Sequence, residues 1–374
     1  MTTKLFRIHL LALTMAFASQ CLAQPNIEGA EVSKDLAADF ENLYKEWNTD
    51  KDRFQHVINQ SEIEIDPLKK IELNRQFYVQ KENLVQRQPA VTNAARAKWL
   101  LEPNISSNAY RWLRGFSSIN ATTYRELEAM VIVDTLLGHK ELIPKTDLTA
   151  MYRRASICAF QMNEFDRARQ YLDVLHGIEP LNLGLSKLRD AAVEYSTLWE
   201  IEQSRREEDS QTGNLPLLAI QTNSGIIAIE LFAEDCPEAV AGFVELAENG
   251  FYDNHELFRA EDRSLAEWRV PAANITESKL NTLRKISQTG DRKQFRGSVI
   301  IVKSGENADC SNFAIALCAL SQQYSSRLTI GRVVEGYEVI AAIRRQLTKE
   351  VTDSGRITKV QIVRRGEPGS SITE

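Results

Sequence analysis

The stretch NGFYDNHELFRAED, from Asn249 to Asp262, contains the residues that decide the fold of the second half of the chain. Its glycine, asparagine and aspartate surround two aromatic residues, a composition typical of a tight turn. An apolar Leu-Phe pair and a single arginine, Arg259, follow this turn. The arginine is either a functional group held by the turn or an ordinary surface residue on a strand.

The first residues of the chain have the composition of a targeting segment. Two basic residues, Lys4 and Arg7, precede an apolar run from Ile8 to Phe17, and small residues lead to Ala23. This pattern predicts a signal peptide over residues 1–23 and export to the periplasm or the extracellular space. The alternative is a lipid anchor at Cys21, although the preceding glutamine is large for that processing site.

Length, charge and hydropathy restrict the organisation and the partners of the chain. At 374 residues, two domains are expected. Removal of residues 1–23 deletes two positive charges, so the net charge changes from −6 to −6 − 2 = −8. An acidic chain without a basic block is not expected to bind nucleic acid. No later stretch is long and apolar enough to predict a membrane span.

The potential metal ligands and cysteines show no pattern typical of a site. His255 and Glu256 begin like a zinc-binding helix, but Arg259 occupies the position of the second ligand. No glycine-rich phosphate loop follows a strand, so no cofactor is expected. The four cysteines after the first 23 residues are interpreted as buried apolar residues, with a Cys310–Cys318 disulfide as the alternative.

Residues 24–208 have the periodicity of an α-helical domain. A first helix is predicted from apolar residues at three-to-four spacing, behind a capping Ser33: Leu36, Phe40, Leu43 and Trp47. Within residues 148–181, a helical hairpin is predicted. The stretch from Met162 to Asn182 resembles the second helix of a tetratricopeptide repeat, but only one copy is found. An ordinary antiparallel helix pair is the alternative.

A change of composition marks the boundary between the two halves. The charged stretch from Arg205 to Asp209 is interpreted as solvated, and residues 209–214 are predicted to be a linker. β-Branched runs, a Thr-Asn-Ser-Gly hairpin signal and short helices then fill residues 215–367, before a tail at 368–374. The predicted fold class is α+β overall: an all-α domain followed by a closed antiparallel β-barrel capped by helices.

The order of these motifs resembles that of the cyclophilin-type peptidyl-prolyl cis-trans isomerases. The TNSG hairpin, the helix opened by CPEAV, the ENGFYD turn, the arginine, the RGS strand, SNFAI and GRVVEGYEVI follow one another as in that family. The resemblance covers residues 215–366 and implies both the barrel and an activity on proline-containing chains.

The resemblance assigns the family's catalytic arginine to Arg259, because Gly250 to Asp253 aligns without a gap. Isomerisation requires rotation about a partly double C–N bond with a barrier of about 20 kcal/mol, and no covalent bond is broken. A guanidinium is a suitable hydrogen-bond donor to the prolyl amide as its resonance is lost. Glu267 replaces the glutamine that supports this arginine and is the second catalytic candidate.

The same alignment assigns the substrate-binding positions, several of which depart from the family. Aromatic residues are replaced by Ser264, Ala314 and, at the wall position, Gln322; the pocket leucine is replaced by Gln323. The resemblance-derived substrate contacts are Ser264, Leu265, Asn312, Phe313, Ala314, Gln323 and Arg327. For Phe313 a place in the core, and for Asn312 a role in holding a loop, are the alternatives. With three of four apolar pocket positions polar or smaller, a weaker grip on proline is expected.

Three functional hypotheses follow from this combination. The first is an exported isomerase that assists folding of proline-containing chains, with the helical domain recruiting a protein partner. The second is a catalytically weak or inactive module that uses the same fold to bind peptides. In the third, the helical domain carries the function and the barrel stabilises it.

Overall fold

The computed structural model describes residues 34–122, 125–212, 215–259, 264–269, 292–304, 307–320, 327–346 and 355–365. The predicted signal peptide, the residue Gln323 and the predicted tail therefore lie outside the described residues. The chain divides into two compact units. The first comprises the residues up to Asn120 together with Glu128–Met151, and the second comprises Ala121–Leu127 and the residues from Tyr152 onward.

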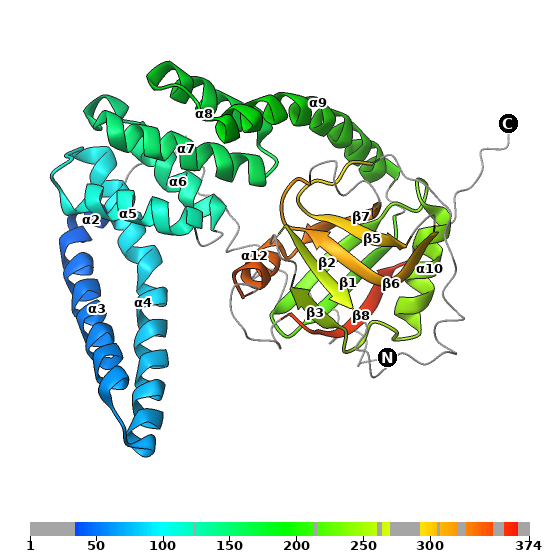
Figure 1. Cartoon of the computed structure of the whole chain (residues 1–374), viewed down its shortest axis with the longest axis horizontal. Helices are drawn as coiled ribbons and strands as arrows, with labels where there is room; N and C mark the ends of the chain where they lie inside the picture. The colour runs from blue at the N-terminus through cyan, green and yellow to red at the C-terminus, as the bar shows by residue number, and fades with distance from the viewer. Residues whose placement is uncertain are drawn as a thin grey trace. The chain divides into compact units, whose positions relative to one another are not determined.

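The first unit is helical (Figure 1). The helices that belong to it wholly or in part are α2 (Lys34–Ala38), α3 (Phe40–Ile63), α4 (Pro67–Leu101), α5 (Asn108–Thr122), α6 (Glu126–Leu137), the short 3-10 helix η1 (Lys140–Leu142) and α7 (Lys145–Gln161). The single helix predicted from Leu36 to Trp47 is thus divided at Asp39. Trp47 and Trp112 pack edge to face with ring centroids 4.7 Å apart, which joins α3 to α5.

Helices α3 and α4 form a long hairpin whose turn has clear local causes. The side chain of Asp66 accepts a hydrogen bond of 2.9 Å from the backbone N–H of Leu68. Pro67 occupies the first helical position, where its missing N–H leaves no bond unmade. This cap begins α4 immediately after α3 ends.

The second unit opens with two further helices, α8 (Phe165–Ile178) and α9 (Leu183–Thr212). The face of α8 predicted from periodicity is buried: Phe165, Ala168, Leu172 and Leu175. Asn163, between α7 and α8, has a left-handed backbone conformation with φ of 66°. Helix α9 continues to Thr212, so residues 205–212, expected as a solvated stretch and the start of a linker, are helical instead.

The remainder of the second unit is an antiparallel sheet with two helices. Its elements are β1 (Leu217–Thr222), β2 (Gly225–Leu231), α10 (Pro237–Glu248), β3 (Glu256–Arg259), β4 (Leu265–Arg269), β5 (Ser298–Ser304), β6 (Asn307–Ala316), β7 (Arg327–Glu335), α12 (Tyr337–Gln346) and β8 (Ile357–Arg364). The strand order is β3-β4-β6-β5-β7-β2-β1-β8, with antiparallel pairs throughout.

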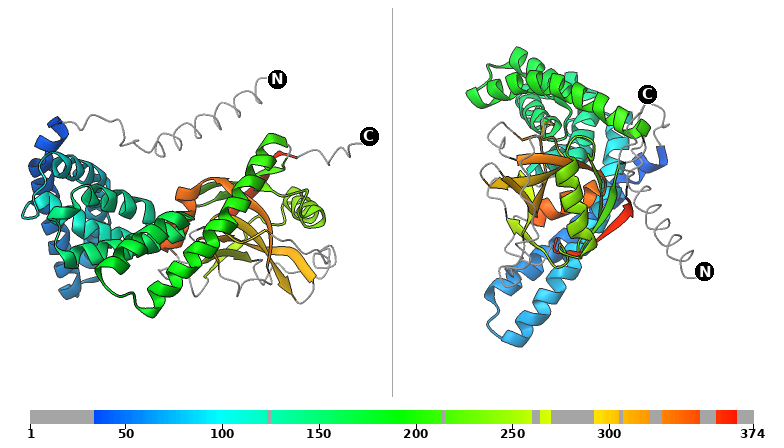
Figure 2. Two further views of the ribbon diagram at one scale, coloured as in Figure 1. Left: turned by 90° about the horizontal axis from the view of Figure 1, so that it is seen from above. Right: turned by 90° about the vertical axis from the view of Figure 1, so that its right-hand side faces the viewer.

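Hydrogen bonds between the two ends of this sheet nearly close it into a barrel. Asn254 N–H donates to the carbonyl of Ile357 at 2.9 Å, and Ile357 N–H donates to the carbonyl of His255 at 3.1 Å. These bonds connect the start of β8 with the residues before β3. The predicted hairpin between β1 and β2 and the predicted helix beginning at Pro237 are both confirmed, as is the fold class (Figure 2).

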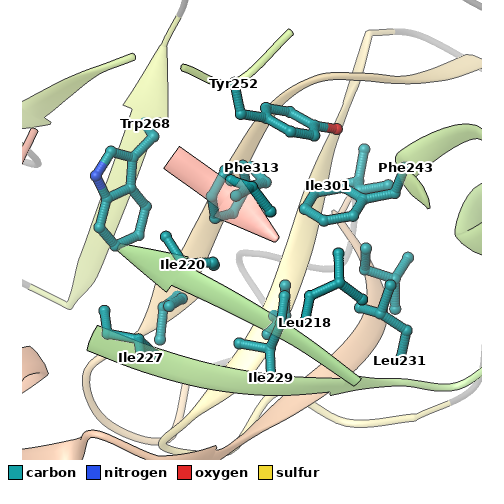
Figure 3. Close-up of a cluster of buried hydrophobic side chains, with 14 of the residues drawn as sticks. Leu218, Ile220, Ile227, Ile229, Leu231, Phe243, Tyr252, Trp268, Ile301 and Phe313 are labelled. Carbon is teal, nitrogen blue, oxygen red and sulfur yellow. The ribbon is translucent and has the colours of Figure 1, made fainter. Parts of the chain in front are cut away.

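The interior of the barrel is apolar and rich in aromatic rings (Figure 3). Phe313 on β6 stacks on Trp268 of β4, with ring centroids 5.2 Å apart and an interplanar angle of 20°. Phe243 of α10 and Tyr252 contact the same ring edge to face. A second, smaller cluster lies among the alternate residues of the same strands: Leu265, Ile300, Ala314, Ala316 and Leu320. Because successive strand residues point to opposite faces, this cluster is on the outer face.

Candidate functional site

The turn before β3 determines where Arg259 is placed in the chain. Gly250 and Asn254 have positive φ angles of 65° and 67°, a conformation that Gly and Asn adopt most readily. The buried Tyr252 hydroxyl donates to the carbonyl of Cys310 at 2.7 Å, which ties the turn to β6. Arg259 is the last residue of β3, and its backbone is in register with Ala266 of β4.

Glu267 lies on β4, in register with Phe258 on one side and with Ala314 on the other. It is a buried carboxylate, and it accepts a hydrogen bond of 2.6 Å from Nε of Arg269. Arg269 is thus one cationic partner of Glu267, while the side chain of Arg259, which the sequence predicts for this role, lies outside the described residues. The buried carboxylate is held at a fixed position on the outer face of the sheet.

Two predicted pocket positions, Leu265 and Ala314, are brought together in the outer cluster. Their exposed fractions are 2% and 0%, so both side chains are enclosed in the full chain. Ser264 is also buried, and its carbonyl accepts a 2.7 Å hydrogen bond from the N–H of Leu317. Of the predicted pocket positions, Leu265 and Ala314 thus belong to a small buried aliphatic cluster, and Gln323 lies outside the described residues.

Phe313 is part of the barrel core and does not belong to the outer cluster. Its ring is fully buried between Trp268, Tyr252 and Phe243. The alternation along β6 turns Phe313 inward because its neighbour Ala314 belongs to the outer cluster. The interpretation of Phe313 as a substrate contact is therefore corrected, and the alternative, a core residue, is the observed one.

The other predicted contacts are more scattered. Asn312 is half-buried, and its amide donates to Oγ of Ser311 at 3.1 Å. Arg327 begins β7, in register with Val302 of β5, and its carbonyl accepts a hydrogen bond from the amide of Gln294. Among the described residues, Leu265, Glu267 and Ala314 lie on one face of the neighbouring strands β4 and β6. Arg327 lies on β7, two strands away from β6.

Helix α9 also contacts the barrel beside the outer cluster. The Tyr195 hydroxyl donates to the carbonyl of Leu320, a member of that cluster, at 2.5 Å. Phe295, just before β5, has its ring centroid 4.8 Å from that of Trp199 and 6.3 Å from that of Tyr195. These contacts were not predicted, because aromatic residues on a helix do not reveal which distant strand they cover.

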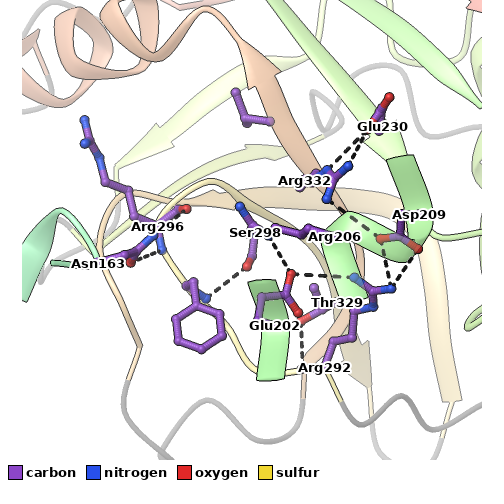
Figure 4. Close-up of polar contacts among 12 residues, drawn as sticks. Asn163, Glu202, Arg206, Asp209, Glu230, Arg292, Arg296, Ser298, Thr329 and Arg332 are labelled. Atoms are coloured by element: carbon purple, nitrogen blue, oxygen red, sulfur yellow. Dashed lines mark hydrogen bonds and ion pairs between the residues drawn. The ribbon is translucent and has the colours of Figure 1, made fainter. Parts of the chain in front are cut away.

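An ion-pair network joins the end of α9 to the barrel (Figure 4). Arg292 contacts Glu202 at 3.6 Å, Asp209 at 3.1 Å and Asp235. Arg332 of β7 contacts Asp209 at 3.8 Å and Glu230 of β2 at 2.9 Å. Every basic group of the network has acidic partners, which indicates a structural role.

The pKa of Asp209 reflects two opposing effects. Burial raises the pKa of this carboxyl above its ordinary value, while Arg292 and Arg332 lower it and Asp235 raises it further. Geometry alone, with two arginines close by, would suggest a lowered pKa. The net direction is upward because the loss of hydration is the largest contribution.

His255 is a further buried residue beside the turn. From the sequence it is considered only as a metal ligand. Its Nε2 is 3.3 Å from the carbonyl of Ser311, and its ring packs against Phe251 and Tyr252. Among the described residues, no group of three or more histidine, cysteine, aspartate or glutamate side chains could hold a metal ion. The imidazole thus serves to anchor the turn on β6.

Two further expectations concern cysteines and membrane spans. Cys158, Cys236, Cys310 and Cys318 are all free thiols, so the alternative of a Cys310–Cys318 disulfide is not observed. Burial is the largest cause that raises the pKa of the Cys158 thiol, to about 12.

Within the described ranges, no helix is both long and apolar enough to cross a bilayer.

Comparison with known proteins identifies the barrel. Residues 217–367 match the family model described as cyclophilin type peptidyl-prolyl cis-trans isomerase/CLD. A peptidyl-prolyl cis-trans isomerase of Helicobacter pylori is 29% identical over 127 residues, which are 33% of this chain and 78% of that protein. Its counterpart in a second strain is 28% identical over 114 residues, covering 30% and 70% of the two chains.

Solved structures of a Cryptosporidium parvum cyclophilin-type isomerase are also similar. One covers 40% of this chain and 97% of its own, with 20% identity and a TM-score of 0.35. Another, determined in the presence of the dipeptide Ala-Pro, has 21% identity and a TM-score of 0.34, and covers 39% and 98% of the two chains. From the family-model match and the strand order described above, residues 217–367 form a cyclophilin-type peptidyl-prolyl cis-trans isomerase domain.

Proposed function

We propose that this protein isomerises X-Pro bonds in polypeptides, with Arg259 as the hydrogen-bond donor to the prolyl amide. The observation that carries the proposal is the family match over residues 217–367, which includes the turn and strand that lead to Arg259. A permanently charged guanidinium can stabilise the amide as its C–N bond loses double-bond character. Glu267 lies on the neighbouring strand β4, paired with Phe258, the residue before Arg259, and supplies a carboxylate close to it in the sheet.

The proposed activity is lower than that of a domain with an aromatic pocket. Ala314 and Leu265 are enclosed in an aliphatic cluster, and neither offers a ring against which proline can pack. Ring contacts contribute roughly 0.5–1.5 kcal/mol each beyond the area that they bury. The loss of two such rings would reduce catalytic efficiency by roughly tenfold or more, since about 1.4 kcal/mol corresponds to a factor of ten.

The test is exchange NMR on a proline-containing tetrapeptide with the full chain, lacking residues 1–23, as catalyst. Cis-trans exchange should be accelerated by the wild-type protein and much less by the variant Arg259→Ala. The matched control is Arg365→Ala, which removes an exposed arginine beyond β8. Equal acceleration by wild type and Arg259→Ala would contradict the proposed role of Arg259. No acceleration at any protein concentration would contradict the proposed activity.

A second candidate function is peptide binding without catalysis. It is favoured by the enclosed state of Leu265 and Ala314, because a surface without a proline pocket can still hold an extended chain. Under this alternative, the same tetrapeptide would shift resonances of the protein while its own cis-trans exchange rate would remain that of the free peptide.

We also propose that the protein acts after export, on chains that fold outside the cytoplasm. The support is the basic, apolar and small-residue order of residues 1–23. Mass spectrometry of the protein from cell fractions should find an N-terminus at Gln24 in the exported fraction. A lipid-modified Cys21 at the N-terminus would favour the anchor alternative, and an intact Met1 would contradict export through this segment.

A further inference from the structure

Helix α4 has two apolar faces, and only one of them is covered in the described chain. The covered face packs on α3 and consists of Leu73, Phe77, Leu84 and Val91, all half-buried or buried. Phe77 and Phe54 of α3 have ring centroids 5.0 Å apart. This face accounts for the α3–α4 hairpin.

The opposite face of α4 carries six residues that we call the outer seam: Leu68, Ile71, Arg75, Tyr78, Glu82 and Val85. The intervals between them are three, four, three, four and three residues, which is the spacing of the a and d positions of a coiled coil, with charged residues at two of the six positions. Leu68, Ile71 and Tyr78 have exposed fractions of 78%, 66% and 67%. Scattered exposed apolar residues are ordinary, whereas four of them at heptad spacing on one helix face indicate a surface that can pack on another helix.

We propose that the outer seam binds the outer seam of a second copy of this chain, with the two α4 helices antiparallel. In the antiparallel register that aligns Leu68 with the partner's Val85, each seam residue faces another seam residue. Ile71 then faces the partner's Glu82, and Arg75 faces the partner's Tyr78. The arrangement is two-fold symmetric, as expected of a homodimer interface.

Charge complementarity selects the antiparallel orientation. The partner's Glu82 faces Ile71, the seam residue next to Arg75, so Arg75 lies close to an opposite charge. By symmetry the same contact forms a second time, between Glu82 and the partner's Arg75. In a parallel, in-register pair, Arg75 would meet the partner's Arg75 and Glu82 the partner's Glu82. Such like-charge contacts are destabilising. A cation above the tyrosine ring adds a further favourable contact.

The size of the seam indicates a moderate affinity. At a rise of about 1.5 Å per residue, the distance from Leu68 to Val85 is about 26 Å. Two helices packed over that length bury on the order of 1,000 Å² in total, near the lower limit of specific interfaces. Interfaces of this size are typical of weak, reversible association.

The test is sedimentation equilibrium of the full chain, without residues 1–23, over a range of concentrations. The wild type should show a reversible monomer–dimer equilibrium. Ile71→Ser and Arg75→Glu should each raise the dissociation constant by about tenfold or more. The double variant Arg75→Glu/Glu82→Arg should restore dimerisation, because it exchanges the two charges. The matched control Val174→Ser, on exposed Val174 of α8, should leave the equilibrium unchanged.

Orientation is read out by cysteine cross-linking. Oxidation of a mixture of Leu68→Cys and Val85→Cys chains should give a cross-linked heterodimer, while either variant alone should not cross-link through this face. A wild type that stays monomeric up to several hundred micromolar would overturn the proposal, as would a double charge exchange that restores nothing. A monomer whose seam instead binds a permanently unfolded polypeptide would assign the surface to client chains and would likewise overturn it.

Discussion

The two faces of the sheet formed by β4, β6 and β5 differ in the side chains that pack on them. The inner face is a close-packed aromatic core around Phe313 and Trp268. On the outer face, the described residues form a smaller aliphatic cluster of Leu265, Ile300, Ala314, Ala316 and Leu320, against which Cys318 packs. Since neighbouring residues such as Phe313 and Ala314 lie on opposite faces, a substitution on the outer face can leave the core unchanged.

The largest expected effect follows from removal of the phenyl ring of Phe313 on the inner face. Phe313→Ala should lower the free energy of unfolding by about 3–5 kcal/mol, because it leaves a cavity among Trp268, Tyr252 and Phe243. Urea unfolding measures the change. As a control on the same strand, Ala314→Gly should cost only about 1 kcal/mol. Comparable losses at the two positions would contradict the distinction between the faces.

The second prediction concerns restoration of a ring on the outer face. Ala314→Phe should lower the free energy of unfolding by about 1–3 kcal/mol, because Ala314 is fully buried and a larger side chain there must displace its neighbours. The measurement is urea unfolding together with the exchange assay. Unchanged stability with faster isomerisation would show that the outer cluster opens into a pocket.

The third prediction tests the contact between α9 and the outer cluster. Tyr195→Phe removes the hydroxyl that donates to the carbonyl of Leu320 and should cost about 1 kcal/mol. Tyr44→Phe, at a half-buried tyrosine of α3 in the first unit, is the control and should leave the stability of the barrel-containing unit unchanged. If the melting transition of Tyr195→Phe equals that of wild type, the hydroxyl contact does not stabilise the unit.

The fourth and smallest effect is the pH dependence linked to Asp209. Its pKa in the folded chain is raised, chiefly by burial, so the folded state binds a proton more tightly than the unfolded state. The stability that proton binding by Asp209 contributes is fully present below its unfolded-state pKa of about 3.9. This stability is lost as the pH rises through the pKa of Asp209 in the folded chain. Asp209→Asn should therefore show a shallower loss of unfolding free energy above about pH 4 than wild type. The opposite difference in slope would mean that Arg292 and Arg332 outweigh burial.

Local patterns predicted much of the barrel. The TNSG hairpin, the helix opened by Pro237 and the turn at Gly250 each depend on residues a few positions apart, and all three form as predicted. The family resemblance implied the same barrel, whereas the strand order was not predicted.

The parts that were not predicted depend on contacts distant in sequence. The charged end of α9 looked like a solvated linker because its partners, Arg292 and Arg332, belong to the barrel. Likewise, the closure of the outer cluster depends on Leu320 and Ile300 meeting Leu265 and Ala314. Glu267 accepts from Arg269, a neighbour on its own strand that the alignment did not consider.

Under the proposed function, proline-containing peptides bind on the outer face beside Arg259, and methyl NMR measures this binding. Titration of the full chain with an Ala-Pro-containing peptide should shift the methyl resonances of Leu265 and Ala314. Those of Leu218 and Ile229, in the barrel core, should shift little. Arg259→Ala should weaken the shifts. Perturbations confined to other surfaces, with Leu265 and Ala314 unchanged at saturating peptide, would contradict the claim.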